Sequence, residues 1–314
     1  MPDGLVSIVT PSYDQAAFLE ETMRSVLEQD YEPIEYVVVD DGSTDGSPEI
    51  IRRYEDRLAW WKRQENAGQV AALNRGFART NGAYMGYLNS DDTLLPGAVS
   101  RMVDELERDP ELLLVYGDAL YTDDTSRRTG YLSSREFDVV EMVRRCDNHV
   151  VQPATLWRRE AWERFGPLDE RGWYFFDFEF FLRFPPDRVR RIPAPLATYR
   201  VHTEAKSTGA AGSRLARDHA RLADTFFAGN GLPEAARAVA EEGRSNAYLL
   251  GAEFAYEALD LPLARRYALK GFRLHPANAS PRWLSLAAKS FLPRRVVSRL
   301  RQRRRAGAPD TVAA

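Results

Sequence analysis

The sequence predicts an α/β protein with a mostly parallel central sheet, followed by an α-helical C-terminal extension. Up to about residue 120, short β-branched runs alternate with helical patterns, which is typical of a parallel sheet with crossover helices. The run 34–40 is nearly all apolar at its end, as expected of a central strand covered on both faces. Beyond about residue 212 the chain contains mainly Ala, Leu, Arg and Glu at helical spacing.

The expected elements alternate in order along the first half of the chain. We expect strands at 6–11, 34–40, 84–88 and 113–116, and helices around 18–27, 70–77 and 99–106. Each expected strand ends at a polar loop, and ligands of open α/β sheets bind beyond the carboxyl ends of the strands. The aromatic-rich segment 137–200 is expected to close over those ends.

Composition limits the classes of protein that this chain can be. Its 314 residues, 44% hydrophobic and 28% charged, can bury a full α/β core and leave a second unit. The net charge is −3, whereas a nucleic-acid-binding protein typically carries a strong positive charge. The single cysteine, Cys146, has no partner for an internal disulfide, so we expect a cytoplasmic setting. No signal peptide or membrane span is expected, which makes the protein soluble or peripheral.

Adjacent acids follow the second expected strand. Asp40 and Asp41 precede Gly42, and carboxylates beside a glycine suit the base or ribose edge of a nucleotide. The same residues also favour a turn with a helix N-cap. Both interpretations remain open for this motif alone.

A second acidic pair, Asp91 and Asp92, follows the strand expected at 84–88. Two carboxylates at a buried strand end repel each other unless a cation or a donor neutralises them. Mg²⁺ or Mn²⁺ held by one or two carboxylates and phosphate oxygens is the usual arrangement around a nucleoside diphosphate. An N-cap before the next helix would leave the second carboxylate unexplained, so the pattern favours a metal.

Asp177 and Glu179 lie within an aromatic run that also contains Arg183. Burial among aromatic rings would raise a carboxyl pKa and make a better base, whereas a structural acid would pair with an arginine. Because the two acids are two positions apart, we expect only one of them to face the crevice.

Arg200 and His202 alternate on an expected extended strand, followed by Lys206. Alternating positions on a strand point to the same side. His can complete a metal shell, and Arg or Lys can neutralise the charge of a departing diphosphate.

Taken together and in order, these segments resemble family 2 glycosyltransferases. The matching segments cover about two thirds of the chain: Val6 to Tyr13, Val37 to Asp45, Asn66 to Gln69 with Ala72 and Asn74, Asn89 to Asp92, Gln152 to Trp157, Gly166 to Glu170, Asp177 to Arg183 and Tyr199 to Ser207. The resemblance implies a GT-A nucleotide-binding sandwich, which is Rossmann-like. It also implies a metal-dependent inverting enzyme of the hexosyltransferase type that uses Mg²⁺ or Mn²⁺.

The resemblance also implies a role for each site residue. Those expected to bind the nucleotide sugar are Pro11, Tyr13, Asp41, Asn74, Asp91, Arg200 and Lys206. Within that set, Pro11 and Tyr13 border the nucleotide, Asp41 holds the base and Asp91 contacts the ribose. Asp92 and His202 are the expected metal ligands, and Asp177 is the expected catalytic base. The family often has an acid just before the base, where this chain has Phe176, so acceptor recognition is expected to differ.

We expect residues 1–212 to form the catalytic domain and 213–314 the helical extension. Similar segments at 232–237 and 261–266 indicate hairpins like tetratricopeptide repeats. Near the end, Leu292, Val296 and Leu300 form one helical stripe surrounded by arginines. This pattern predicts either peripheral contact with an anionic membrane or a solvated basic helix.

The implied function is transfer of a sugar from a nucleoside-diphosphate sugar to a glycan or lipid-linked acceptor in surface polysaccharide or glycan synthesis. A nucleotidyltransferase would normally show a Gly- and Lys-containing phosphate loop, which the segment 10–15 lacks. A non-catalytic scaffold that binds a partner through its helical module is the other alternative. The intact acids at Asp41, Asp91, Asp92 and Asp177 argue against it.

Overall fold

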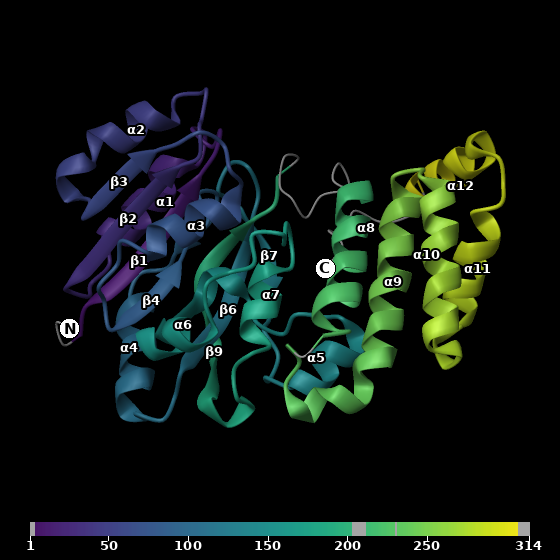
Figure 1. Ribbon diagram of the computed structural model, residues 1–314. Helices are drawn as coiled ribbons and strands as arrows, with labels where there is room; N and C mark the ends of the chain where they lie inside the picture. Colours follow the sequence, from purple (N-terminus) through teal and green to yellow (C-terminus); the bar gives the residue numbers. More distant parts are fainter. Residues whose placement is uncertain (1–3, 203–211, 230, 307–314) are drawn as a thin grey trace. The chain divides into compact units, whose positions relative to one another are not determined.

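The computed structural model describes residues 4–202, 212–229 and 231–306, with the backbone alone at 300 and 302–306. It contains two compact units (Figure 1). The first comprises Met1–Asp138 and Asn148–His202, and the second comprises Val139–Asp147 and Thr203–Ala314. The short helix α5 (Val139–Arg145) therefore groups with the helical unit, although it lies within the expected catalytic stretch.

The first unit is built on one mixed sheet with the order β3-β2-β1-β4-β8-β6-β9-β5, and β7 pairs with β6. Strands β1 to β4 are mutually parallel; β1, β2 and β4 match strands expected from the sequence, whereas β3 was not expected. β8 is antiparallel to both of its neighbours, and β6 and β9 form a second parallel pair. The strands are β1 Val6–Ser12, β2 Ile34–Asp40, β3 Trp60–Arg63, β4 Tyr84–Tyr87, β5 Thr93–Leu94, β6 Leu114–Thr122, β7 Arg128–Leu132, β8 Thr155–Arg158 and β9 Val189–Arg200.

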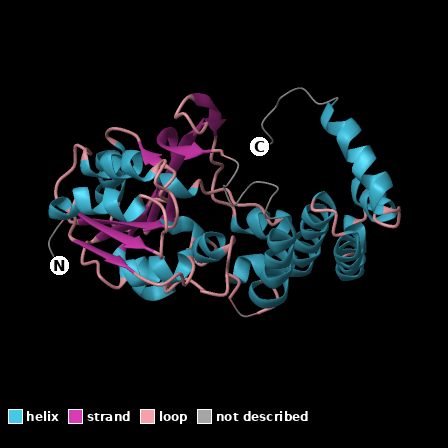
Figure 2. Ribbon diagram, turned by 90° about the horizontal axis from the view of Figure 1, so that it is seen from above, coloured by secondary structure: helices cyan, strands magenta, loops and turns pink. Residues whose placement is uncertain are grey.

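Helices cover both faces of this sheet (Figure 2). The predicted apolar spacing is confirmed in α1 and α4, whose buried side chains join β1 and β2 in one core. α3 packs on the other face, where Gly76 lies against Val9 and Val39. The helices of this unit are α1 Leu19–Leu27, α2 Ser47–Arg53, α3 Gln69–Phe77, α4 Ala98–Arg108, α6 Arg159–Phe165 and α7 Phe176–Phe181.

The second unit is helical. Besides α5 it contains α8 Gly212–Arg221, α9 Ala240–Glu257, α10 Leu261–Leu274, α11 Pro281–Lys289 and α12 Arg294–Ala306. α9 is the central helix and packs against α5, α8 and α10. Asn246 on α9 donates its side-chain N–H to the carbonyl of Arg144 at 2.7 Å, which ties α5 to this unit. Among the described helices, none is both long and apolar enough to cross a bilayer.

Candidate active site

The polar loops gather at the carboxyl edge of the sheet. β1 and β2 end side by side, with Ser12 opposite Asp40, and β4 runs parallel to β1. β6 and β9 also end together, with Thr122 opposite Arg200. β5, directly after 91–92, pairs with the end of β9. Polar loops from distant parts of the chain thus share one edge, which is where ligands of open α/β sheets bind.

Asp41 organises the loop that faces it. The carboxyl group is buried and accepts hydrogen bonds from Gln64 Nε2 at 2.6 Å, Ala67 N at 2.9 Å and Gly68 N at 2.8 Å. Gly68 has a φ of +94°, which a residue with a side chain rarely adopts. Three of the roughly four acceptor sites of Asp41 therefore shape the segment 64–68, which leads into α3.

The loop after β1 is bound to the loop after β2. Asp14 Oδ1 accepts from Thr44 N at 2.6 Å, and Ala16 N donates to Asp45 Oδ2 at 2.8 Å. Pro11 lies buried within β1, whereas Tyr13 is 47% exposed. A phenol ring exposed at a strand end can stack on a planar base.

The acidic pair meets His202. Asp91 Oδ2 lies 3.1 Å from His202 Nε2, while Asp92 Oδ1 accepts a hydrogen bond from the backbone N–H of Arg200 at 2.9 Å. Asp92 is only 3% exposed, and burial together with the Asp91 carboxylate raises its pKa well above the ordinary range. A bound cation would offset both effects.

Asp91 and His202 fit adjacent ligands of a divalent ion. Their 3.1 Å separation is close to the ~3 Å expected between two ligand atoms that lie at right angles about 2.1 Å from one ion. An imidazole beside carboxylates suits Mn²⁺ better than Mg²⁺. Among the described side chains there is no cluster of three or more His, Cys, Asp or Glu arranged to hold a metal.

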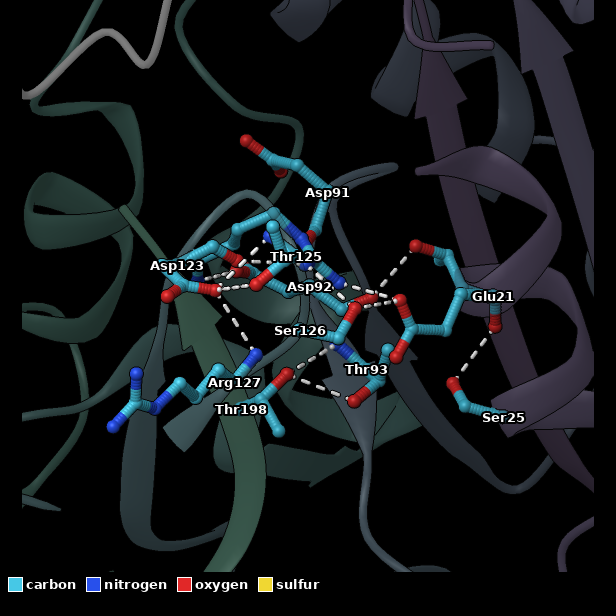
Figure 3. Close-up of polar contacts among 12 residues, drawn as sticks. Glu21, Ser25, Asp91, Asp92, Thr93, Asp123, Thr125, Ser126, Arg127 and Thr198 are labelled. Carbon is cyan, nitrogen blue, oxygen red and sulfur yellow. Dashed lines mark hydrogen bonds and ion pairs between the residues drawn. The ribbon is translucent and has the colours of Figure 1, made fainter. Parts of the chain in front are cut away.

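Arg200 contacts the residues around the acidic pair, and Glu21, Asp91, Asp92, Asp123 and Ser126 of this corner are drawn in Figure 3. Its guanidinium is buried and stacks on the Phe18 ring, 4.7 Å from the ring centroid. The same ring contacts His202, with a centroid distance of 4.8 Å. The guanidinium donates to Asp91 O at 2.8 Å, Asp123 O and Ser126 Oγ at 2.9 Å each, and Glu21 Oε2 at 2.7 Å. Arg200 thus links the backbone of the acidic pair to α1 and to the turn after β6.

Asp177 lies on the short helix α7 and is partly exposed, whereas Glu179 is buried. Its Oδ1 accepts the N–H of Phe178 at 2.7 Å. Burial raises the pKa of Tyr87 well above its usual range, and the charges of Asp177 and Asp92 add to this shift. Both carboxylates therefore lie within electrostatic range of one phenol at the end of β4.

Asn74 and Lys206 are the other two residues expected to bind the nucleotide sugar. Asn74 on α3 exchanges hydrogen bonds with the backbone of Leu168, at 2.9 and 3.0 Å, and also contacts Glu170. In this structure it clamps the segment 168–170. Lys206 lies outside the described residues.

A chain of amides behind the acidic pair was not among the expected site residues. Gln69 Nε2 donates to Asn89 Oδ1 at 2.6 Å, and Asn89 Nδ2 donates to Gln152 Oε1 at 3.1 Å. Gln152 in turn donates to the carbonyl of Tyr87 at 2.9 Å. All three residues lie in segments that carry the family resemblance, which is the signal that could have singled them out.

The sequence model of glycosyl transferase family 2 matches residues 7–165. A relative named as a putative teichuronic acid biosynthesis glycosyltransferase, TuaG of Bacillus subtilis, is 41% identical over 91 residues. An uncharacterized glycosyltransferase of Nostoc is 28% identical over 211 residues. The matches cover 28% and 63% of this chain, and 36% and 65% of the respective relatives.

Solved structures share the fold. S. aureus TarS in complex with UDP-GlcNAc superposes with a TM-score of 0.63 at 16% identity, over 95% of this chain and 91% of that one. The mannosyltransferase PcManGT from Pyrobaculum calidifontis, in complex with GDP-Man and Mn²⁺, gives 0.56 at 19% identity, over 95% and 84%. At these identities the likeness concerns the fold alone.

Proposed function

Because this chain belongs to glycosyl transferase family 2, we propose that it transfers a sugar from a nucleoside-diphosphate sugar to an acceptor hydroxyl. The GT-A fold expected from the sequence is confirmed by the solved structures. The observation that carries the proposal is the meeting of Asp91 and His202, 111 positions apart, at the carboxyl edge of the sheet. The names of the relatives and the donors bound by the solved structures support this donor class.

The donor would lie across the strand ends. We place the base beside Tyr13 and the loop 64–68 that Asp41 holds, and the diphosphate beside Asp91, Asp92 and His202. A divalent ion held there, Mn²⁺ in preference to Mg²⁺, would stabilise negative charge on the departing diphosphate. Asp92 and His202 are the proposed ligands, and the contact between His202 and Asp91 makes Asp91 a further candidate.

Asp177 is the proposed general base. It takes the proton of the acceptor hydroxyl while the acceptor oxygen forms a bond to the anomeric carbon. The bond from that carbon to the diphosphate oxygen breaks on the opposite face, so a single displacement inverts the centre. Tyr87 and Tyr174 lie within electrostatic range of this carboxylate and would form part of its surroundings.

The acceptor is proposed to be a growing glycan or a lipid-linked glycan used in surface polysaccharide synthesis. The relative named for teichuronic acid biosynthesis supports this class. We place the reaction in the cytoplasm, an assignment supported by the single buried cysteine, Cys146.

The test combines a donor screen with the variant Asp177→Asn. Release of nucleoside diphosphate from a panel of sugar donors, with and without chelator, identifies the donor and the metal requirement. Asp177→Asn should lower transfer on the order of 10³-fold, because base catalysis is lost, while calorimetry still detects the nucleoside diphosphate. Asp187→Asn, an exposed acid in the same unit, is the matched control. Undiminished transfer by Asp177→Asn would remove the base from the proposal.

A further inference from the structure

Helix α11 presents an apolar face to solvent. Leu284 is 50% exposed, Phe291 60% and Leu292 39%, and Ala288 is also exposed. The backbone continues to turn after α11, since Phe291 N donates to Ala288 O and Leu292 N donates to Lys289 O. Positions i, i+4, i+7 and i+8 lie on one side of a helix, so these residues form a single stripe. Leu286 and Ala287 are the buried residues of α11.

The next helix adds Val296, which the sequence predicts in one helical stripe with Leu292. Val296 on α12 is 37% exposed, whereas its neighbour Val297 is fully buried. The side chain of Leu300 lies outside the described residues. We define the apolar stripe as Leu284, Ala288, Phe291, Leu292 and Val296.

The turn that carries Phe291 contacts Arg265 of α10. The guanidinium of Arg265 on α10 lies 4.2 Å from the centroid of the Phe291 ring, and its N–H donates to Ser290 O at 3.2 Å. The largest apolar side chain of the stripe is therefore fixed in an outward position and not left to collapse onto the unit. Such a fixed, exposed apolar surface is characteristic of an interaction site.

The segment 281–306, which carries the stripe, has charges of one sign. Residues 281–306 contain nine of the 43 Lys and Arg residues of the chain and none of the 46 Asp and Glu residues. Arg282 and Arg301 pair with Glu253 and Glu257 of α9. The remaining basic residues with described side chains are exposed and no described acid pairs with them: Lys289, Arg294, Arg295 and Arg299.

We propose that α11, the turn after it and the start of α12 dock on the surface of an anionic lipid bilayer. The apolar stripe would insert among the acyl chains just below the headgroups, and the basic residues would contact lipid phosphates. Burial of Leu and Phe side chains supplies the apolar part of the binding energy, and each nearby Lys or Arg adds about 1 kcal/mol at an anionic surface. Four of the five stripe residues are aliphatic, and aliphatic side chains bury well among acyl chains but do not stack on bases, so the stripe favours a bilayer over nucleic acid.

The consequence for function rests on the proposed transferase activity. A bilayer-bound enzyme would meet a lipid-linked acceptor by diffusion in two dimensions, whereas a soluble acceptor would gain nothing. Stripe variants should therefore leave turnover with a soluble acceptor unchanged.

The test is sedimentation of the full chain with phosphatidylcholine vesicles, with and without phosphatidylglycerol. We expect binding at least about tenfold tighter to the anionic vesicles, because four exposed basic residues contribute. Phe291→Ser/Leu292→Ser should lower this binding at least about tenfold at any salt concentration, since it removes apolar burial. Arg294→Glu/Arg295→Glu should lower it most at low salt.

Matched controls use the same chemistry elsewhere. Leu269→Ser changes an exposed leucine of α10 outside the stripe, and Arg52→Glu/Arg53→Glu changes an adjacent exposed pair in α2. Both should bind vesicles like the parent chain. Equal losses in the controls, no preference for anionic vesicles, or a stripe that instead mediates self-association or nucleic-acid binding would each overturn the proposal. Vesicle binding without donor turnover would refute the proposed function and leave this surface intact.

Discussion

At the scale of single residues, Arg200 shows that a cation expected to contact a diphosphate can instead bind the protein around the acidic pair. The sequence indicates a diphosphate contact, because the residue lies two positions before His202 on an extended strand. In the structure the guanidinium nitrogens donate to Asp91 O, Asp123 O, Ser126 Oγ and Glu21. We therefore propose that it acts as a positioning residue for the acidic pair.

Replacement of Arg200 should weaken metal-dependent donor binding. Arg200→Lys keeps the charge but loses the planar fork that reaches several acceptors at once, and Arg200→Met loses both. Both variants should reduce Mn²⁺-dependent nucleoside diphosphate affinity by about 10- to 100-fold, as expected when support of metal ligands is lost. Calorimetry with and without Mn²⁺ measures this.

The control is Arg127→Met, which changes an exposed residue of the turn 123–127 that Arg200 contacts. This variant should bind the nucleoside diphosphate normally. A direct diphosphate contact would give another pattern. Arg200→Lys would then retain most of the affinity, and Arg200→Met would lose it equally with and without metal.

At the scale of elements, the sequence predicts the parallel half of the sheet well. The run Ile34–Asp40 is a strand with the expected bounds, because an apolar run that ends at polar residues marks a buried strand end. The antiparallel insertion of β8 and the long pairing of β6 with β9 were not predicted. Those pairings join segments that are distant in sequence, and local patterns do not specify such partners.

The same limit applies to the candidate site. Each acidic motif is visible locally, but the contact between Asp91 and His202 spans 111 positions, and only the family resemblance linked them. The amide chain from Gln69 to Gln152 depends on three separate segments. Partners of that kind become evident only when the strand order is known.

Gly76 tests how closely α3 must approach the sheet. An added Cβ would lie 2.4 Å from Val9 Cγ1 and 3.3 Å from Val39 Cγ2. Val9 is fully buried and stiff about χ1, so it cannot move aside easily. Gly76→Ala should gain up to about 1 kcal/mol of helix propensity but lose about 1–3 kcal/mol through overpacking.

Thermal unfolding should therefore show a lower Tm for Gly76→Ala. Val9→Ala alone leaves a cavity and also destabilises, but the added methyl group partly fills it. In the double variant the loss should be smaller than the sum of the two single losses. A higher Tm for Gly76→Ala would mean that α3 does not pack this closely on β1.

At the scale of the whole molecule, two units carry different kinds of chemistry. The first holds the strand-end residues proposed to bind the donor, and the second presents the apolar stripe with its basic border. The net charge of −3 conceals this division, because the nine basic residues of 281–306 are offset by acids elsewhere in the chain. The first unit can therefore be tested by donor binding, and the second by vesicle binding and by its own stability.

The helical unit should lose stability in mild acid, and the variant His219→Gln should lose less. His219 is 3% exposed, lies with Nδ1 2.9 Å from Leu215 O and packs on the Phe254 ring, and burial lowers its pKa to about 4. Between about pH 6.5 and 4 the unfolded chain binds a proton at this position and the folded chain does not, so stability falls as pH falls through this window. The loss of stability totals about 3 kcal/mol and levels off below pH 4.

Hydrogen exchange of peptides from 212–274, corrected for the intrinsic pH dependence, measures this effect. Local opening should become more frequent as the pH falls in the parent chain, and it should depend less steeply on pH in His219→Gln. Identical slopes would mean that other groups control the acid response, and that His219 is protonated in the folded unit.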